Sequence, residues 1–302
     1  MSAIRNFSEL HQQVLQLPKR VRVAVCRPAD EHTLQAVLEA VEMGFVRAIL
    51  VGECAENLLE NLDPKVREQI ERVPAVGDEE AAQKAVEWVH DGKADVLMKG
   101  LLNTDVLLRH VLKKEYGLRP EGAVISHIAA FETGRVDRLL LVSDVAVIPQ
   151  PTLEQRAAQL RYTTTMARRL GIETPRAAML HCTEKVSEKF PLTLDYVTLK
   201  ERVAAGEFGS MLLDGPLDLA CALSPAALAD KRIESSLEGQ ADILLMPDIQ
   251  AGNILYKALH FFLPDGLSAS LLCGTTHPVV LTSRGDSTAT KINSLALAAL
   301  QV

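Results

Sequence analysis

Residues 94–104 read Ala-Asp-Val-Leu-Met-Lys-Gly-Leu-Leu-Asn-Thr, and this stretch decides the fold class. The mostly apolar run Asp95–Met98 has the length and composition of a buried strand, and apolar residues recur at helical spacing after Thr104. A short polar turn with a glycine joins the two segments. A buried strand that passes through such a turn into a helix is the repeating unit of a parallel α/β sheet.

The same alternation of strand and helix extends through the rest of the chain. Further strands are expected at Val21–Cys26, Ala48–Val51, Leu139–Val142, Ala177–Leu180, Met211–Leu213, Ile243–Met246, Leu271–Cys273 and Val279–Thr282. Helices are expected at Glu31–Met43, Glu79–His90, Thr104–Lys114, Leu153–Leu170, Asn253–Phe262 and Thr288–Leu300. About nine strands are many for one small sheet. We therefore expect two α/β domains, each with a mostly parallel sheet flanked by helices.

The boundary between these domains is expected at the polar stretch Glu132–Asp137. On this interpretation the first domain comprises residues 1–134 plus 275–302, and the second comprises residues 135–274. The chain would thus return to its first domain near the end of the sequence.

Composition excludes several classes of function. The 302 residues are 48% hydrophobic and 24% charged, the balance of an ordinary globular protein. The net charge of −7 argues against a nucleic-acid or anionic-membrane surface, because such surfaces need a broad basic face. Five scattered cysteines without a CxxC pair indicate a reducing compartment and no zinc site. Without an apolar signal region or a spanning run of about 18 residues, we expect a cytoplasmic protein.

Three junctions where a strand runs into a helix carry the residues suited to chemistry, because ligands of open α/β sheets bind at the carboxyl ends of the strands. The first junction holds Lys99, Gly100, Asn103 and Thr104. Lysine supplies a point charge, glycine permits close backbone approach, and a helix start offers free N–H groups to an anion. The alternative is a lysine at a turn followed by an ordinary helix cap.

The second junction is Thr282-Ser283-Arg284-Gly285-Asp286-Ser287. A guanidinium group such as that of Arg284 binds phosphate through two hydrogen bonds, and Ser283 and Ser287 add hydroxyl donors. Asp286 supplies a carboxylate. Four polar groups at one strand end are more than helix capping needs, so we expect a site here, the alternative being a capped helix with a surface ion pair.

The third junction contains Asp248, Gly252 and Asn253, where Asp248 either projects into a cleft or only shapes a turn. Two smaller candidates are Ser126-His127, which follow an apolar run, and Asp144, which follows the strand expected near residue 140. Asp214 and Asp218 are four residues apart, but Gly215-Pro216 separates them, which disfavours a helical metal pair. GxGxxG, GxxxxGK[ST] and GxSxG motifs are absent from the sequence, so a dinucleotide site, a P-loop and a hydrolase elbow have no support.

The sequence resembles the phosphate acetyltransferase/butyryltransferase family over most of its length. The resemblance is carried by Met-Lys-Gly-x-x-x-Thr (98–104), Ile-Ser-His (125–127), Ser-Asp (143–144), Pro-Thr-Leu-Glu (151–154), Leu-Asp-Gly-Pro-Leu (213–217), Ala-Asp-Ile-Leu-Leu-Met-Pro-Asp-Ile-Gln-Ala-Gly-Asn (241–253) and Leu-Thr-Ser-Arg-Gly-Asp-Ser (281–287). The compact length is more similar to the butyryl branch than to the larger acetyl enzymes.

This resemblance implies two α/β domains similar to the isocitrate/isopropylmalate dehydrogenase type, with the active cleft between them. It implies the reversible reaction of acyl-CoA and phosphate to acyl phosphate and CoA, with a short acetyl, butyryl or branched acyl group. Coenzyme A and phosphate are then substrates, and neither a metal nor a permanently bound cofactor is implied. Ser283 and Arg284 match the family's phosphate-binding pair, and a homodimer or larger homo-oligomer is expected.

The sequence departs from the family pattern at several polar positions. Thr290 stands where acetyl-type enzymes carry an aspartate proposed as the base for the CoA thiol, so Asp286 becomes the replacement candidate. Ile148 stands where the family usually has Asn, Ser187-Glu188 where it often has Asn-Pro, and Ala220-Cys221 where it commonly has Asp-Asn. These changes leave two alternatives open: a CoA- or acyl-phosphate-binding protein without turnover, and a metal- and NAD-dependent hydroxy-acid dehydrogenase of the same fold, which only Asp214 and Asp218 favour.

Overall fold

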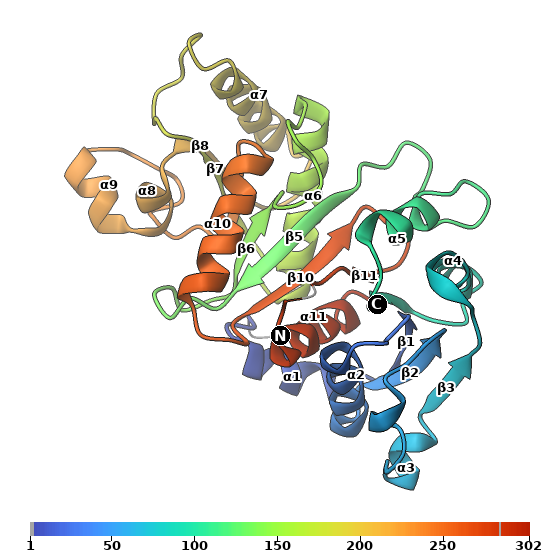
Figure 1. Ribbon diagram of the computed structural model, residues 1–302. Coiled ribbons are helices and arrows are strands. Elements are labelled where there is room, and N and C mark those ends of the chain that lie inside the picture. Colours follow the sequence, from blue (N-terminus) through green and yellow to red (C-terminus); the bar gives the residue numbers. More distant parts are fainter. Residues whose placement is uncertain (1–2, 284) are drawn as a thin grey trace. The chain divides into compact units, whose positions relative to one another are not determined.

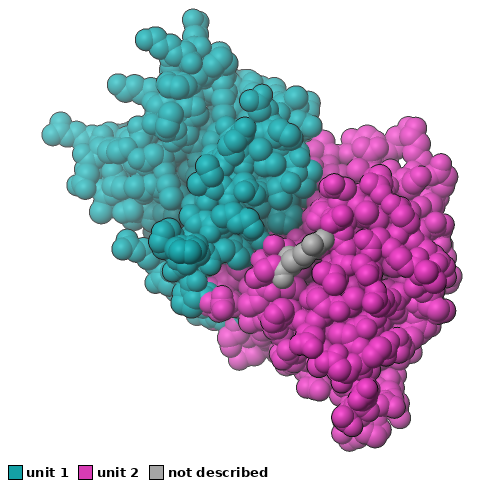
Figure 2. All heavy atoms as spheres, in the orientation of Figure 1, with its two compact units in different colours: residues 1–7, 126–264 teal, residues 8–125, 265–302 magenta. Residues whose placement is uncertain are grey.

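The computed structural model describes residues 3–283 and 285–302 of the chain, drawn as a ribbon in Figure 1. The chain divides into two compact units, coloured separately in Figure 2. Unit 1 consists of Met1–Phe7 and Ser126–Pro264, and unit 2 consists of Ser8–Ile125 and Asp265–Val302. Each unit is an α/β structure whose strands are mostly parallel and flanked by helices, which confirms the predicted α/β fold class, although the strands belong to one 11-stranded sheet and not to two sheets.

The strands of unit 2 lie in the order β3-β2-β1-β4-β11-β10. These strands are β1 (Val21–Cys26), β2 (Val46–Val51), β3 (Ile70–Val73), β4 (Val96–Lys99), β10 (Ser268–Cys273) and β11 (Val279–Val280). Neighbours run parallel except β10 and β11, which are antiparallel. The helices are α1 (Phe7–Val14), α2 (Glu31–Met43), α3 (Pro64–Arg67), α4 (Gly77–His90), α5 (Thr104–Val111) and α11 (Thr288–Ala299), with a 3₁₀ turn at Glu56–Leu58.

The strands of unit 1 lie in the order β5-β6-β9-β7-β8. Its strands are β5 (Ser126–Phe131), β6 (Leu140–Ser143), β7 (Arg176–Leu180), β8 (Leu212–Leu217) and β9 (Ile243–Leu245). Only the β5–β6 pair is antiparallel. The helices are α6 (Leu153–Arg169), α7 (Leu192–Ala204), α8 (Leu219–Leu223), α9 (Pro225–Lys231) and α10 (Ile249–Phe262).

The division of the chain differs from the predicted domain boundaries at 134/135 and 274/275. Glu132–Asp137 is not a linker, because it belongs to the connection between the antiparallel strands β5 and β6, both within unit 1. Strand β10 likewise pairs with β11 inside unit 2. The structural division therefore falls before β5 and after α10, at Ser126 and Pro264.

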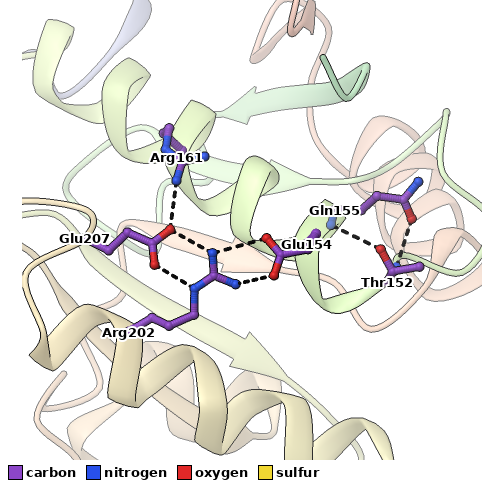
Figure 3. A network of polar contacts seen from close by, with 6 residues as sticks. All are labelled: Thr152, Glu154, Gln155, Arg161, Arg202 and Glu207. Carbon is purple, nitrogen blue, oxygen red and sulfur yellow. Dashed lines mark hydrogen bonds and ion pairs between the residues drawn. The ribbon is translucent and has the colours of Figure 1, made fainter. Parts of the chain in front are cut away.

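Charged side chains of unit 1 fix the start of α6 against α7, as Figure 3 shows. Arg202 of α7 donates to both carboxylate oxygens of Glu154 and to both of Glu207, and Arg161 also pairs with Glu207. Thr152 and Gln155 form a capping box that satisfies the first N–H groups of α6. The Pro-Thr-Leu-Glu motif thus anchors a helix.

Within residues 3–283 and 285–302, no helix is both long enough and apolar enough to cross a bilayer.

Candidate active site

The two strand-end turns of unit 2 follow neighbouring strands. β4 and β11 run parallel with Met98 opposite Val280, so the turn after Lys99 and the turn before Ser287 leave the same edge of the sheet. Two neighbouring strand ends therefore carry predicted site residues. The end of β4 carries Lys99, Gly100, Asn103 and Thr104, and the end of β11 leads to Ser283, Asp286 and Ser287. Arg284, the fourth predicted residue of the second turn, lies outside the described residues.

The Lys99 turn buries its ammonium group. The lysine is only 4% exposed, and its Nζ donates to the carbonyl oxygens of Gly100 at 3.1 Å and Leu102 at 3.4 Å. Asn103 occupies the N-cap position of α5, and Thr104 is the first residue of that helix. A buried cation next to a helix N-terminus creates a local positive potential suited to an anion.

Gly100 is required by close packing of this turn on the end of β1. A Cβ atom at residue 100 would lie 2.3 Å from the Arg27 carbonyl oxygen and 2.6 Å from that of Cys26. The Gly100 N–H donates to the Cys26 carbonyl at 2.9 Å. Any side chain would therefore push the Lys99 turn away from its support.

Arg27 braces the same turn and was not predicted as a site residue. Its Nη1 donates to the Leu101 carbonyl at 3.0 Å, and its guanidinium pairs with Asp78 at 2.6 Å and Glu53 at 2.7 Å. Its backbone has a φ of +51°, which is uncommon for a residue with a side chain. The only signal in the sequence was an arginine directly after a predicted strand.

The Ser283 turn is shaped by its own aspartate. The Asp286 carboxylate accepts a hydrogen bond from the Ser283 N–H at 2.7 Å, and the Asp286 N–H donates to the Ser283 carbonyl at 3.2 Å. Ser287 caps α11 by accepting from the Thr290 N–H at 3.2 Å. Thr290 also exchanges hydroxyl hydrogen bonds with Ser287 and Ser268, both at 3.2 Å. The position of the acetyl-type aspartate thus belongs to a chain of hydroxyl groups, of which Thr290 and Ser268 are buried and Ser287 is partly exposed.

Lys291 lies beneath this turn and was also missed by the sequence analysis. It is 1% exposed, and its Nζ donates to the Asp286 carbonyl and, at the long limit of 3.5 Å, to the Ser283 carbonyl. Burial lowers the pKa of its ammonium group, while the charges of Asp286 and Asp30 partly oppose that effect. The available signal was a lysine at the start of the otherwise uncharged segment 291–299.

The candidate residues of unit 1 are arranged differently, around the Asp144 carboxylate. One oxygen of this buried group accepts from the Ser126 hydroxyl at 2.8 Å and from the His127 N–H at 3.0 Å. The other accepts from the N–H groups of Ala146 and Val147, both at 2.7 Å. Ser126 and His127, which follow an apolar run in the sequence, are the first residues of β5. These hydrogen bonds join β5 to the turn after β6.

The start of α10 packs on the same turn. Asp248 is the N-cap and accepts from the Ala251 N–H at 2.9 Å, so α10 begins at Ile249 and not, as predicted, at Asn253. A Cβ atom on Gly252 would lie 2.0 Å from the Asp144 carbonyl oxygen. The Asn253 amide donates to the Val145 carbonyl at 3.0 Å. Asp248, Gly252 and Asn253 therefore hold α10 against the Asp144 turn.

Arg156 of α6 completes this support and was not predicted. Its guanidinium is buried and donates to the carbonyl oxygens of Met246 at 3.1 Å and Pro247 at 2.5 Å, immediately before Asp248. An arginine at a helical position gives no sequence signal for such a contact, because the carbonyls belong to a segment ninety residues away.

Asp214 and Asp218 hold two different lysines, which removes the feature that favoured a metal-dependent dehydrogenase. Asp214 pairs with Lys200 at 2.6 Å, and Asp218 pairs with Lys231 at 2.5 Å. The Cys221 N–H, followed by Lys231, lowers the pKa of Asp218 to about 2. Lys231 also pairs with Glu184 at 2.5 Å, so an ammonium group already occupies the one cluster of metal-ligand types in the described residues, Glu184, Asp218 and Cys221.

Fold and site together define a class: an α/β protein that presents buried lysines and a serine-containing turn at neighbouring strand ends, an arrangement suited to phosphate groups. Comparison with known proteins is consistent with this class. Residues 68–299 match the family described as Phosphate acetyl/butaryl transferase, and the chain belongs to this family.

Relatives of similar length share the family. The chain is 42% identical to a phosphate butyryltransferase of Clostridium acetobutylicum over 301 residues, covering 98% of each protein. It is 38% identical to a phosphate acetyltransferase of Thermotoga maritima over 285 residues, covering 93% of this chain and 95% of the relative. The crystal structure of a branched-chain phosphotransacylase from Enterococcus faecalis is similar with a TM-score of 0.78 and 32% identity, covering 93% and 98% of the two chains.

Proposed function

We propose that the protein is a phosphate acyltransferase, which moves a short acyl group reversibly between coenzyme A and inorganic phosphate. The carrying observation is the pair of turns on β4 and β11, one with Lys99 and the other with Ser283 and the buried Lys291. Family membership and the phosphate butyryltransferase and phosphate acetyltransferase relatives support the same reaction.

The reaction needs little beyond correct placement of its two substrates. A phosphate oxygen attacks the thioester carbonyl carbon, a C–O bond forms, the C–S bond breaks, and CoA leaves as a thiolate that takes up a proton. Ser283, Ser287 and Arg284 hold the phosphate, and Lys99 stabilises the negative charge that develops on the carbonyl oxygen. Asp286 remains our candidate base for the thiol in the reverse direction.

The residues of unit 1 have a supporting part in this proposal. The hydrogen bonds of Asp144 and Asn253 and the close approach of Gly252 fix the turns after β6 and β9. Ser126, His127 and Asp248 belong to the same network. We propose that this network keeps the turns after β6 and β9 rigid.

The direct test is thiol release from acetyl-, propionyl-, butyryl- and isobutyryl-CoA, with and without phosphate. Phosphate-dependent release is expected and ranks the acyl groups. The Arg284→Ala variant should raise the phosphate KM. It should also lower kcat/KM, by a factor that corresponds to a loss of about 2–4 kcal/mol of transition-state binding. An Arg284→Ala enzyme with wild-type kinetics would contradict the assignment.

The same assay decides the alternative of a binding protein without turnover. That alternative rests on the replaced positions Ile148, Ser187, Ala220 and Cys221, all of which belong to unit 1. A folded wild-type protein that binds CoA in calorimetry but releases no thiol with any acyl-CoA would establish it.

We also propose that the protein is a homodimer or larger homo-oligomer. Helix α10 exposes Ile254, Phe261 and Phe262, the two phenylalanines by 82% and 78%. On the same unit, leucines of α8 and α10 line an apolar cavity of about 800 Å³. Apolar patches of this kind mark surfaces that bind other proteins. Light scattering should show an oligomer that a Phe261→Ser/Phe262→Ser variant dissociates, and a monomeric wild-type protein would contradict the proposal.

A further inference from the structure

The buried Lys291 is a costly residue for its position on α11 (dark red in Figure 1). It occupies the first turn of a helix whose residues 290–299 are all buried. Removing an ammonium group from water costs several kcal/mol or more unless it is well paired, and an uncharged chain such as methionine would fill the same space without that cost. The charge therefore needs a local explanation.

The explanation lies in the two carbonyl groups that Lys291 contacts. They belong to Ser283 and Asp286, the residues at the two ends of the turn that carries the phosphate-binding motif. In a planar peptide unit the C=O and N–H groups point in opposite directions. Fixing the Asp286 carbonyl on Lys291 therefore sets the direction of the Ser287 N–H at the start of α11.

The contact also removes a repulsion. Carbonyl oxygens carry partial negative charge and would oppose a phosphate bound at the turn. Lys291 draws two of them toward α11, while Asp286 holds the Ser283 N–H from within the turn. The lysine charge adds a positive potential beneath the bound anion, stronger in the protein interior than in water.

We infer that Lys291 is a positioning residue: it anchors the carbonyls of Ser283 and Asp286 and thereby orients the donors of the turn toward phosphate. This inference rests on the proposed acyltransferase function. It assigns Lys291 an effect on phosphate that acyl-CoA does not share, because both contacts lie in the phosphate-binding turn.

The test uses two substitutions at residue 291 and a matched control on the same helix. Lys291→Met removes both the donors and the charge, whereas Lys291→Gln removes the charge and retains two N–H donors on a shorter side chain. The control is Asn293→Leu. Asn293 is buried two residues further on, and its amide donates to the carbonyls of Gly266 at 2.6 Å and Ser268 at 3.3 Å, outside the turn.

We expect the phosphate KM to rise about tenfold or more in Lys291→Met and about threefold in Lys291→Gln, with the acyl-CoA KM within about twofold of wild type in both. Asn293→Leu should lower the melting temperature without this selective rise. A phosphate KM near the wild-type value in Lys291→Met, or equal rises in both KM values, would overturn the inference. Should Lys291→Met fail to fold, an unchanged phosphate KM in Lys291→Gln would overturn it equally.

Calorimetric titration with inorganic phosphate separates this inference from the proposed function. If the wild-type protein shows no phosphate-dependent thiol release, the proposed function fails. A phosphate affinity that decreases from wild type to Lys291→Gln to Lys291→Met would still support the role of Lys291. Equal affinities in the three proteins would exclude it.

Discussion

The strand-end turns of the two units contain similar polar residues but use them in opposite ways. In unit 2, buried lysines donate hydrogen bonds to backbone carbonyl oxygens of the Ser283 and Lys99 turns. In unit 1, the Asp144 carboxylate accepts four hydrogen bonds from its own surroundings, and Asp248 caps a helix. The first arrangement leaves positive potential at the strand ends, and the second satisfies its charge internally. Polar residues after a strand therefore do not by themselves identify the residues that contact substrate.

The largest effect is expected from Lys99→Met. On the proposed mechanism, loss of this buried cation should lower kcat/KM by about 10²–10³-fold. Steady-state kinetics against both substrates measures this loss. Lys84→Met is the control, because that lysine forms a partly exposed ion pair with Glu80 on α4 of the same unit. Equal losses of kcat/KM in Lys99→Met and Lys84→Met would show that the Lys99 turn contributes no more to catalysis than the surface of unit 2.

A matched pair of glycines tests the two units next. Gly100→Ala and Gly252→Ala each place a Cβ atom within 2.3 Å of a backbone oxygen, and each should destabilise its unit by about 2–4 kcal/mol. Only Gly100→Ala should also raise the phosphate KM, because only that turn carries Lys99. Urea unfolding and kinetics give both quantities.

Gly122→Ala controls for the backbone in this pair. Gly122 has a φ of +72°, but a Cβ atom there would have nothing within 4 Å. Its smaller loss of stability measures the cost of an unfavourable φ alone. A Gly252→Ala variant with raised phosphate KM and normal stability would reverse the roles assigned to the two units.

A moderate effect is expected from Asp144→Asn. The amide has one oxygen where the carboxylate had two, so two of the four donors lose their partner. Stability should fall by about 1–3 kcal/mol, seen as a lower urea midpoint. Any change in the phosphate KM should be smaller than that of Lys99→Met. Normal stability together with a large rise in phosphate KM would instead place Asp144 among the substrate contacts.

The smallest effect concerns acid stability of unit 1. The pKa of Asp218 lies at about 2, below its usual 3.8, so its charged form is favoured by folding. The resulting stability is present above about pH 4 and is lost as the pH falls toward 2. Asp218→Asn should reduce this part of the pH dependence by on the order of 1 kcal/mol, because solvent screens the partly exposed pair. Thermal melts of both proteins across that range measure the difference.

Local signals were sufficient for much of the fold. The helix Glu31–Met43 was predicted to the residue, because Asp30 caps its start and Gly44, with a φ of +101°, ends it. Strand β5 was missed because its sequence begins with Ser126 and His127 and contains two alanines, so it shows neither a strong apolar run nor alternation. Because β5 was missed, the polar stretch Glu132–Asp137 resembled a linker between domains. It is the connection between the paired strands β5 and β6 of unit 1.

The site was predictable in position but not in detail. The rule that ligands bind at strand ends selected the turns after β4, β9 and β11. It could not show that the Asp144 carboxylate is saturated by hydrogen bonds, since its donors come partly from β5. Arg27 and Lys291 were missed for the same reason: each acts on carbonyl groups of a turn, and only the folded chain shows which ones.

Unit 2 takes its last strands and helix from the far end of the chain, and this affects how the protein is made. β11 pairs with β4, and α11 packs on α2, yet residues 126–264 are synthesised in between, which takes roughly ten to thirty seconds at ribosomal rates. Unit 1 is thus complete before unit 2 can close. During that interval β4 presents an unpaired edge, the type of surface that recruits chaperones or other nascent chains. The Ser283 turn is among the last parts of the protein to be assembled.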